Sequence, residues 1–132
     1  MKKEAIIPEG QQVVYDHYHF APAIKVGQTV YVSGQGGGRA DGTMPESLEE
    51  QLDNAFAKVK QVLEAAGATM ADIVELLSYH VDIQKDAHLV FAVKDRHIPS
   101  DFPAWTAVGV AGLAGAGMLV EIKAVAVFGS AG

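Results

Sequence analysis

The clearest pattern along the chain is a helical repeat of apolar residues between positions 48 and 66. Residues three or four apart lie on one face of an α-helix, so the pattern predicts an amphipathic helix that buries this stripe. Ser47 and Glu50 form a capping-box pattern at its start, and Gly67 stands where helices commonly end in a left-handed residue. The residues of the stripe are Leu48, Leu52, Ala55, Phe56, Val59, Val62, Leu63 and Ala66.

The residues before this helix predict a β-hairpin. The runs Ala23 to Val26 and Thr29 to Ser33 are β-prone, and Gly27-Gln28 separates them. A two-residue break that contains glycine between two such runs is typical of a tight hairpin turn.

Further strands are predicted after the helix. Alternation of side chains over 74–83 has the period of two that is typical of a strand, and a short capped turn is expected just before it, from Thr69 to Asp72. Two closing strands are expected at about 104–110 and 118–128, joined by the Gly- and Ala-rich segment 111–117.

A second, shorter helix is predicted between these strands. It begins with Asp86 as its N-cap, runs to about His97 and is stopped by Pro99. The order β-β-α-β-α-β-β predicts one α+β domain, residues 1–132, with a single sheet and both helices on one face. The residues of the second helix expected to face inward are Leu89, Val90 and Val93.

Composition narrows the function classes. The net charge is −6, with 10 basic residues scattered among 16 acidic ones, whereas a protein that tracks phosphates needs clustered cations. Lys2 and Lys3 form the one close basic pair, which we interpret as a solvated terminus. No apolar run is long enough to span a membrane, and cysteine is absent, as is common in reducing compartments. We therefore expect a cytoplasmic protein whose partners are small molecules, with no nucleic acid and no membrane.

Two motifs suggest sites that the spacing does not support. The glycine-rich run from Ser33 to Arg39 lacks the Gly-Lys-Ser/Thr that a phosphate loop requires, so we expect it only to line a pocket with backbone. His17 and His19 would share a strand face as two metal ligands, but a zinc site needs a third. The other histidines lie at no recognisable spacing, and we predict no metal and no cofactor.

Glu121 is the most informative acidic residue, because it is expected to share a strand face with the aliphatic residues Leu119, Val125 and Val127. A carboxylate in such surroundings is paired, protonated or used, and a raised pKa would suit a general acid or base. A salt bridge to Lys123 or to an arginine at an interface is the alternative, which the pattern leaves open. The single tryptophan, Trp105, stands at the start of a predicted strand, where packing is its commoner role.

Several segments resemble the RidA family, also called the YjgF family, and one of them is similar to its YjgH-like branch. The similarity extends from about residue 20 to 128. It is carried by Ala23-Ile-Lys-Val-Gly-Gln-Thr-Val-Tyr-Val-Ser-Gly-Gln35, Val62-Leu-Glu-Ala-Ala-Gly-Ala68, Val120-Glu-Ile-Lys-Ala-Val-Ala126, and, for the branch, Phe102-Pro-Ala-Trp-Thr-Ala-Val-Gly-Val110 with Leu113-Ala-Gly115.

The resemblance implies a chorismate-mutase-like α+β fold, a homotrimer, and pockets at the subunit interfaces. Typical members hydrolyse enamines and imines to ketones and ammonia. In them an arginine binds the substrate carboxylate, while a strand glutamate and nearby backbone groups hold the attacking water. One proton acceptor and proximity are enough for an iminium carbon, which reacts readily with a positioned water.

Carried over residue by residue, the family pattern is incomplete. Glu121 corresponds to the strand glutamate, and Ser33 with Gly34 to the pocket-lining segment. Trp105 replaces the arginine, Ala107 replaces a cysteine, and Phe20 replaces a pocket tyrosine, with Thr106 between the first two. An indole offers one N–H donor and cannot clamp a carboxylate as a guanidinium does.

We therefore expect a substrate other than a simple 2-imino acid, held against an aromatic wall of Trp105 and Phe20. Arg39 is a candidate to replace the missing cation, and Gln84 is a candidate pocket amide. The leading hypothesis is an imine or enamine hydrolase in which Glu121 positions water. The alternative is a trimer that binds or senses a small ligand without catalysis, and an endoribonuclease or translation inhibitor is a third, which the acidic charge disfavours.

Overall fold

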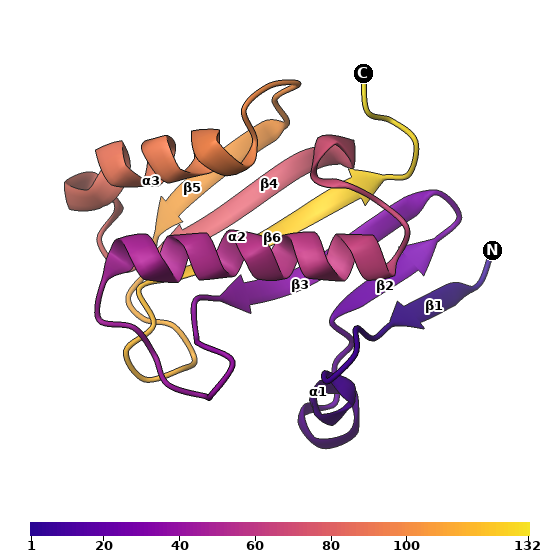
Figure 1. Ribbon diagram of the computed structural model, residues 1–132, viewed down its shortest axis with the longest axis horizontal. Helices are drawn as coiled ribbons and strands as arrows, with labels where there is room; N and C mark the ends of the chain where they lie inside the picture. The colour runs from indigo at the N-terminus through magenta and orange to yellow at the C-terminus, as the bar shows by residue number, and fades with distance from the viewer.

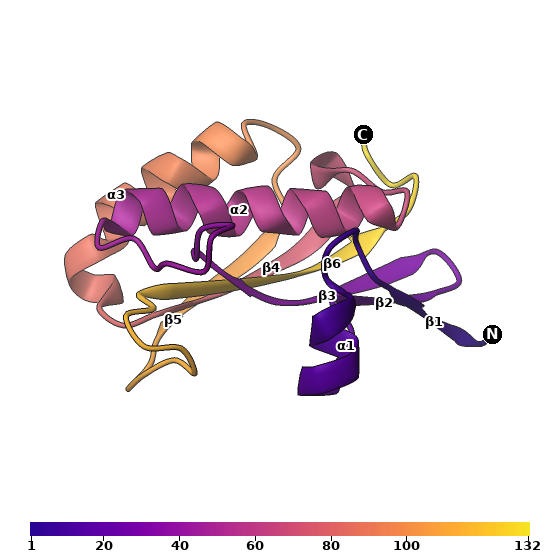
Figure 2. The same cartoon turned by 60° about the horizontal axis from the view of Figure 1, so that its bottom comes forward.

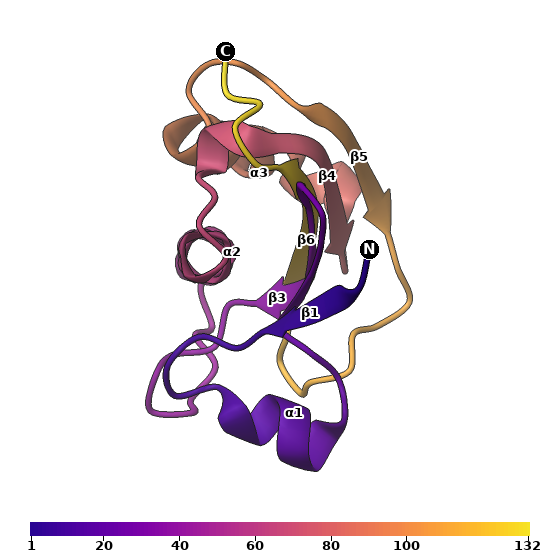
Figure 3. The ribbon, with the colours of Figure 1, turned by 90° about the vertical axis from the view of Figure 1, so that its right-hand side faces the viewer.

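Two helices cover one face of a six-stranded sheet and leave its other face open, as the three ribbon views show (Figures 1, 2 and 3). The computed structural model describes all residues from Met1 to Gly132. The strands lie in the order β1-β2-β3-β6-β4-β5, and β4 pairs with β5 in parallel while the other pairs are antiparallel. The elements are β1 Lys3–Ile6, α1 Gln12–Tyr18, β2 Ala23–Val26, β3 Thr29–Gly36, α2 Leu48–Ala65, the 3-10 turn η1 Met70–Asp72, β4 Ile73–His80, α3 Ile83–His97, β5 Ala104–Gly109 and β6 Val120–Val127.

The long helix α2 confirms the predicted stripe. Phe56 and its apolar neighbours are buried on the side that faces β3 and β6, where they meet Val32 and Ile122. Ser47 caps the helix by accepting a hydrogen bond from the amide of Glu50 at 3.2 Å. The reciprocal half of the capping box is missing, because the Glu50 carboxylate binds Arg39 instead.

The second helix begins earlier than predicted, which corrects the expected boundary. β4 ends at His80, and α3 starts at Ile83, with Asp82 rather than Asp86 at the N-cap position. The amide of Asp86 already donates to the carbonyl of Asp82 at 3.1 Å, which is a helical hydrogen bond. The period-two pattern of side chains extends through Val81 and Asp82, but these two residues form the turn between β4 and α3. The predicted strand was therefore too long.

The N-terminal segment holds two elements that the sequence pattern did not predict. β1 pairs with β2 at the sheet edge, and α1 lies on the opposite side of the sheet from α2 and α3 (Figure 2). β1 buries only Ile6 and α1 buries no residue, so neither element needs a repeat of apolar residues that a sequence pattern could reveal. His17 lies in the last turn of α1, and His19 follows it in a left-handed conformation, so the expected strand face with two histidines does not exist.

Gln51 joins the start of α2 to the segment before β6. Its side chain is fully buried, and its amide nitrogen donates to the carbonyls of Pro45 at 2.7 Å and Gly117 at 2.9 Å. Its amide oxygen accepts from the backbone of Leu119 at 2.8 Å. These three hydrogen bonds satisfy the buried side-chain amide of Gln51. They also fix the start of β6, where Glu121 lies, relative to the start of α2.

Asp72 closes the short turn before β4 and should make stability depend on acid pH. Burial alone would raise the pKa of Asp72, but hydrogen bonds from the Thr69 and Ala131 amides outweigh it and hold the pKa below 3.8, its ordinary value. The stabilisation is therefore present above that value and lost as the pH falls through the lower folded pKa. We expect Asp72→Asn to cost about 1 kcal/mol at neutral pH.

That difference between wild type and Asp72→Asn should shrink as the pH approaches the folded pKa, because the wild-type carboxyl then becomes protonated. Urea unfolding of both proteins at a series of pH values down to the acid limit of folding measures it. A difference that stays constant across the series would contradict this role for Asp72.

None of the helices is both long and apolar enough to cross a lipid bilayer.

Candidate functional site

Glu121 lies on the open face of the sheet, near the start of β6. Its neighbours across the sheet are Gly36 of β3 and Tyr79 of β4, and Lys123 and Val125 follow it on the same face of β6. The side chain is half-buried and makes no hydrogen bond or ion pair within the chain, so the alternative of a salt bridge to Lys123 is not realised. Glu121 is therefore a carboxylate with free hydrogen-bonding capacity on the face that α2 and α3 leave uncovered.

Gly34 makes the space that the Glu121 carboxylate occupies. The register of β3 against β6 shifts between Val32 and Gln35, and this irregularity brings Gly34 against the glutamate. A Cβ added to Gly34 would lie 2.6 Å from Cδ and 2.8 Å from Oε2 of Glu121. Only a residue without a side chain fits this close approach.

A pocket of about 660 Å³ adjoins this part of β3 and is lined by residues of the N-terminal elements. Ser33, next in the chain to Gly34, lines it, and its hydroxyl donates to the carbonyl of Ala21 at 2.7 Å. Phe20 lies in the same pocket, half exposed, so the structure brings together two of the predicted substrate-binding residues. We call it the open-face pocket; its lining residues are Lys3, Ala5, Tyr15, His19, Phe20, Ala21, Ile24 and Ser33.

Trp105 lies on the face of the sheet that α2 and α3 cover, whereas Phe20 lines the open-face pocket. Trp105 of β5 is level with the buried Leu76 of β4, so both side chains point toward the helices. The indole N–H donates to the Ser78 hydroxyl at 2.9 Å, and the ring packs edge-on against Phe91 of α3 at a centroid distance of 5.2 Å. Within one chain, Trp105 cannot share a wall with Phe20.

The residues after Trp105 follow the same alternation. Ala107 is level with Ser78 and faces the helices, whereas Thr106 is level with Leu77 and is exposed on the open face. Of the predicted segment 105–107, only Thr106 therefore lies on the same face as Glu121.

His80 extends the hydrogen bonds of Trp105 into the core and was not predicted from the sequence. Its Nε2 lies 2.8 Å from the Ser78 hydroxyl, and its Nδ1 has no partner although the ring is buried. Burial lowers the pKa of His80, and the nearby charge of Asp86 opposes this only in part. The ring is therefore neutral at physiological pH and serves with Ser78 to hold the indole in place.

Arg39 is not a free cation. Its Nε and Nη2 bind the two carboxylate oxygens of Glu50 at 2.8 and 3.0 Å, and its Nη1 donates to Thr43 at 3.1 Å. It lines a separate polar cavity of about 670 Å³ with Glu50 and Lys58 of α2. The charge of Arg39 is therefore paired within the chain, and Arg39 does not line the open-face pocket of its own chain; its role as the replacing cation stays a prediction.

The remaining predictions concern Gln84 and metal binding. Gln84 is exposed in the first turn of α3 and lines neither cavity. No group of three or more His, Cys, Asp or Glu side chains is close enough to hold a metal ion.

Comparisons with known proteins agree with one another. Residues 12–128 match the family model described as Endoribonuclease L-PSP. The chain is 35% identical over 127 residues to the RutC family protein YjgH of Escherichia coli, covering 96% of this chain and 95% of that protein. It is also 35% identical over 112 residues to the 2-iminobutanoate/2-iminopropanoate deaminase of Bos taurus, covering 83% of this chain and 80% of that protein.

Solved structures show the same similarity. A structure of protein YjgH superposes with a TM-score of 0.86 at 35% identity, covering 97% of this chain and 98% of that one. The crystal structure of RidA from an Antarctic Psychrobacter bacterium gives a TM-score of 0.78 at 32% identity, covering 83% of this chain and 88% of that one.

Proposed function

Because this chain belongs to the RidA (YjgF) family of Endoribonuclease L-PSP domains, we propose that it hydrolyses the imine or enamine form of a small molecule, with Glu121 as the catalytic residue. The observation that carries the proposal is the unpaired Glu121 carboxylate, which lies against Gly34 beside the open-face pocket. Relatives whose names state 2-iminobutanoate/2-iminopropanoate deaminase support the reaction class.

The reaction needs one proton acceptor and one positioned water. Water attacks the iminium carbon and a C–O bond forms, while Glu121 accepts a proton from the water. The proton then returns to the nitrogen of the carbinolamine. The C–N bond breaks as the carbinolamine hydroxyl gives its proton to Glu121, and that proton leaves with the ammonia, so a carbonyl compound and ammonium are the products. Holding water and substrate together supplies most of the acceleration, because the iminium carbon is already electrophilic.

We propose that a homotrimer completes the open-face pocket. The uncovered sheet face supports this, because it carries apolar side chains such as Tyr31 and Val108 that are 51% and 36% exposed. A neighbouring copy seated there would cover Glu121 and the open-face pocket together. A cytoplasmic location stays a prediction from the composition.

Trp105 favours the alternative of a binding protein without catalysis, because the family's cation is absent and the indole is already bound to Ser78. The test is ammonia release from imines that an amine oxidase generates in place from varied primary amines. Hydrolysis faster than the spontaneous rate supports the proposal. If no imine is turned over but a carbonyl compound raises the thermal midpoint of the protein, the chain is a binder and the proposal is wrong.

Gly34→Ala should separate the site from the fold. The new Cβ collides with the flexible end of Glu121 rather than with backbone, so the glutamate rotates away. We expect a loss of at least about tenfold in kcat, since displacing a catalytic group by an ångström can cost up to about a hundredfold. Stability should change by less than about 1 kcal/mol. Wild-type activity in a folded Gly34→Ala protein would show that the position of Glu121 does not matter.

A further inference from the structure

The open-face pocket carries a positive charge that the sequence pattern did not predict. Its lining includes Lys3 and His19 but no acidic residue, although the whole chain has a net charge of −6. The two cations considered from the sequence and the family pattern are not available there, since Trp105 replaces one and Arg39 is bound to Glu50. Lys3 is therefore the cation that the pocket holds in their place.

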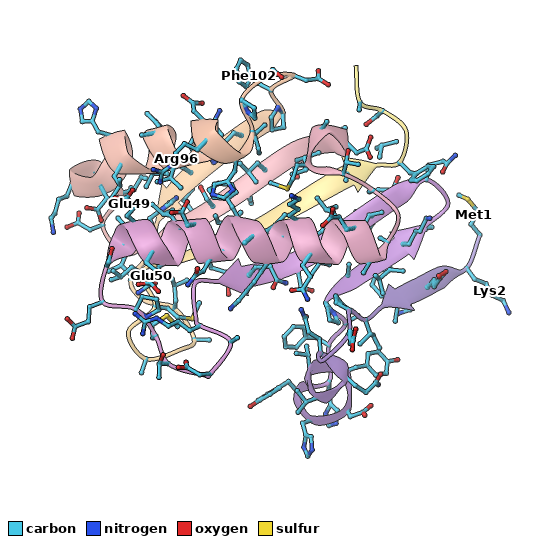
Figure 4. The ribbon with its side chains drawn as sticks, viewed as in Figure 1. Met1, Lys2, Glu49, Glu50, Arg96 and Phe102 are labelled. Carbon is cyan, nitrogen blue, oxygen red and sulfur yellow. The ribbon has the colours of Figure 1, made fainter.

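Lys3 is directed to the pocket by the register of the edge strand. It is level with Val26, and Ala5 is level with Ile24, so alternate residues of β1 share the open face with β2. Lys3 forms no ion pair or hydrogen bond within the chain. Its neighbour Lys2 lines neither the open-face pocket nor the cavity of Arg39, and it projects outward beyond the end of β1 (Figure 4).

The strand that carries Lys3 lies outside the part of the chain that the family model matches, which begins at residue 12. The charge is therefore supplied by a residue outside the range that the family model matches. Its origin in β1 explains why the carry-over of family residues could not find it.

The position of Lys3 along the sheet sets the length of the ligand. Ile6 is level with Ala23, which is level with Val32, next to Ser33, whereas Lys3 lies three residues further along β1. At about 3.3 Å per residue this separates the backbone of Lys3 from that end of the pocket by roughly 10 Å, part of which the lysine side chain spans. Glu121 lies at the Ser33–Gly34 end. A carboxylate at Lys3 and an imine carbon at Glu121 are therefore several bonds apart.

The rest of the pocket lining includes the aromatic side chains of Tyr15 and Phe20 and the apolar side chain of Ile24. Such a lining favours a flat or hydrocarbon segment with polar groups at its ends. We infer that Lys3 binds the carboxylate of an elongated imine, whose carboxylate and imine carbon are separated by a ring or a chain, while Glu121 acts at the imine end. This inference rests on the proposed function, and it names the substrate class of the same site.

The test compares two imines that differ in one carboxylate. An amine oxidase generates them in place from 4-(aminomethyl)benzoate and from benzylamine, and ammonia release is followed for wild type, Lys3→Met and the matched control Lys2→Met. Lys3→Met should raise KM for the carboxylate-bearing imine about tenfold, as loss of one charged hydrogen bond would, with kcat unchanged. The benzylamine imine and the Lys2→Met protein should show no such effect.

The outcomes separate the two proposals. If wild type hydrolyses the imines and Lys3→Met behaves like Lys2→Met, the role of Lys3 is wrong and the proposed function stands. If wild type hydrolyses neither, the proposed function fails for this substrate class. Calorimetric binding of 4-acetylbenzoate then decides Lys3 alone: weaker binding to Lys3→Met than to Lys2→Met supports the inference, and equal or absent binding overturns it.

Discussion

Replacing Glu121 by Gln should reduce the rate of imine hydrolysis by about a hundredfold or more while the protein stays folded. The amide keeps the shape of the side chain but cannot accept the proton of the attacking water, and general-base catalysis typically contributes a factor of about 10² to 10⁴. Because Glu121 makes no hydrogen bond or ion pair within the chain, its replacement breaks no stabilising contact. The loss should appear in kcat, measured as ammonia release at saturating imine.

Glu75→Gln is the matched control for this experiment. Glu75 lies on β4, level with Val125 of β6 and therefore on the same open face, but it is exposed, whereas Glu121 is half-buried against Gly34. Its replacement changes the charge of that face by the same amount. Equal losses in the Glu75 and Glu121 variants would mean that the net charge of the face matters, and that Glu121 is not the proton acceptor.

Gly37→Ala should produce the largest loss of stability of any single methyl group added to the glycine loop. A Cβ at Gly37 would lie 2.3 Å from both Cα and the carbonyl oxygen of Gln51, which are backbone atoms that no rotamer change can move. β3 and α2 would have to separate, and with them the three hydrogen bonds of the buried Gln51. We expect a cost of about 3 kcal/mol, at the upper end of the range for overpacked cores.

Urea unfolding at a fixed protein concentration measures this cost, with Gly112→Ala as the control. Nothing lies within 4 Å of a Cβ built on Gly112, so that variant should be neutral. A Gly37→Ala protein as stable as the control would show that β3 and α2 do not approach as closely as described. We interpret the glycine at position 37 as a requirement of close packing against Gln51, and not of phosphate binding, which glycine-rich loops provide in other proteins. The same result would contradict this interpretation.

The parts of the fold that the sequence predicted are those with local signals. The stripe of α2, the Ser47 cap and the Gly27-Gln28 turn each depend on residues close together in the chain, and all are present. β1 and α1 lack such signals because they bury almost nothing, and their positions depend on pairing with β2. The start of α3 was misplaced for the opposite reason, since the alternation continued through Val81 into a turn.

Strand alternation and the family resemblance predicted part of the site. Glu121 does share its face with Val125, and Ser33 and Phe20 do line one pocket. The face of Trp105 depends on which residue of β4 it pairs with, and that register is a long-range property the local pattern does not contain.

Charge partners were equally hidden from the sequence. Arg39 pairs with a residue 11 positions away whose expected role was to complete a helix cap. Lys3 belongs to a strand with no apolar pattern, so its place in the pocket follows only from pairing of β1 with β2. A lone lysine near a terminus carries no sequence signal that distinguishes a ligand contact from a solvated side chain.

The central claim is that Glu121 and the open-face pocket form one catalytic cleft between copies of this chain. A crystal structure with 4-acetylbenzoate bound tests it most directly. We predict that the ketone carbon lies within reach of the Glu121 carboxylate, in a cleft that a second copy covers. A ligand found only in the polar cavity of Arg39 and Lys58, or a Glu121 side chain open to solvent in the assembled protein, would contradict the account.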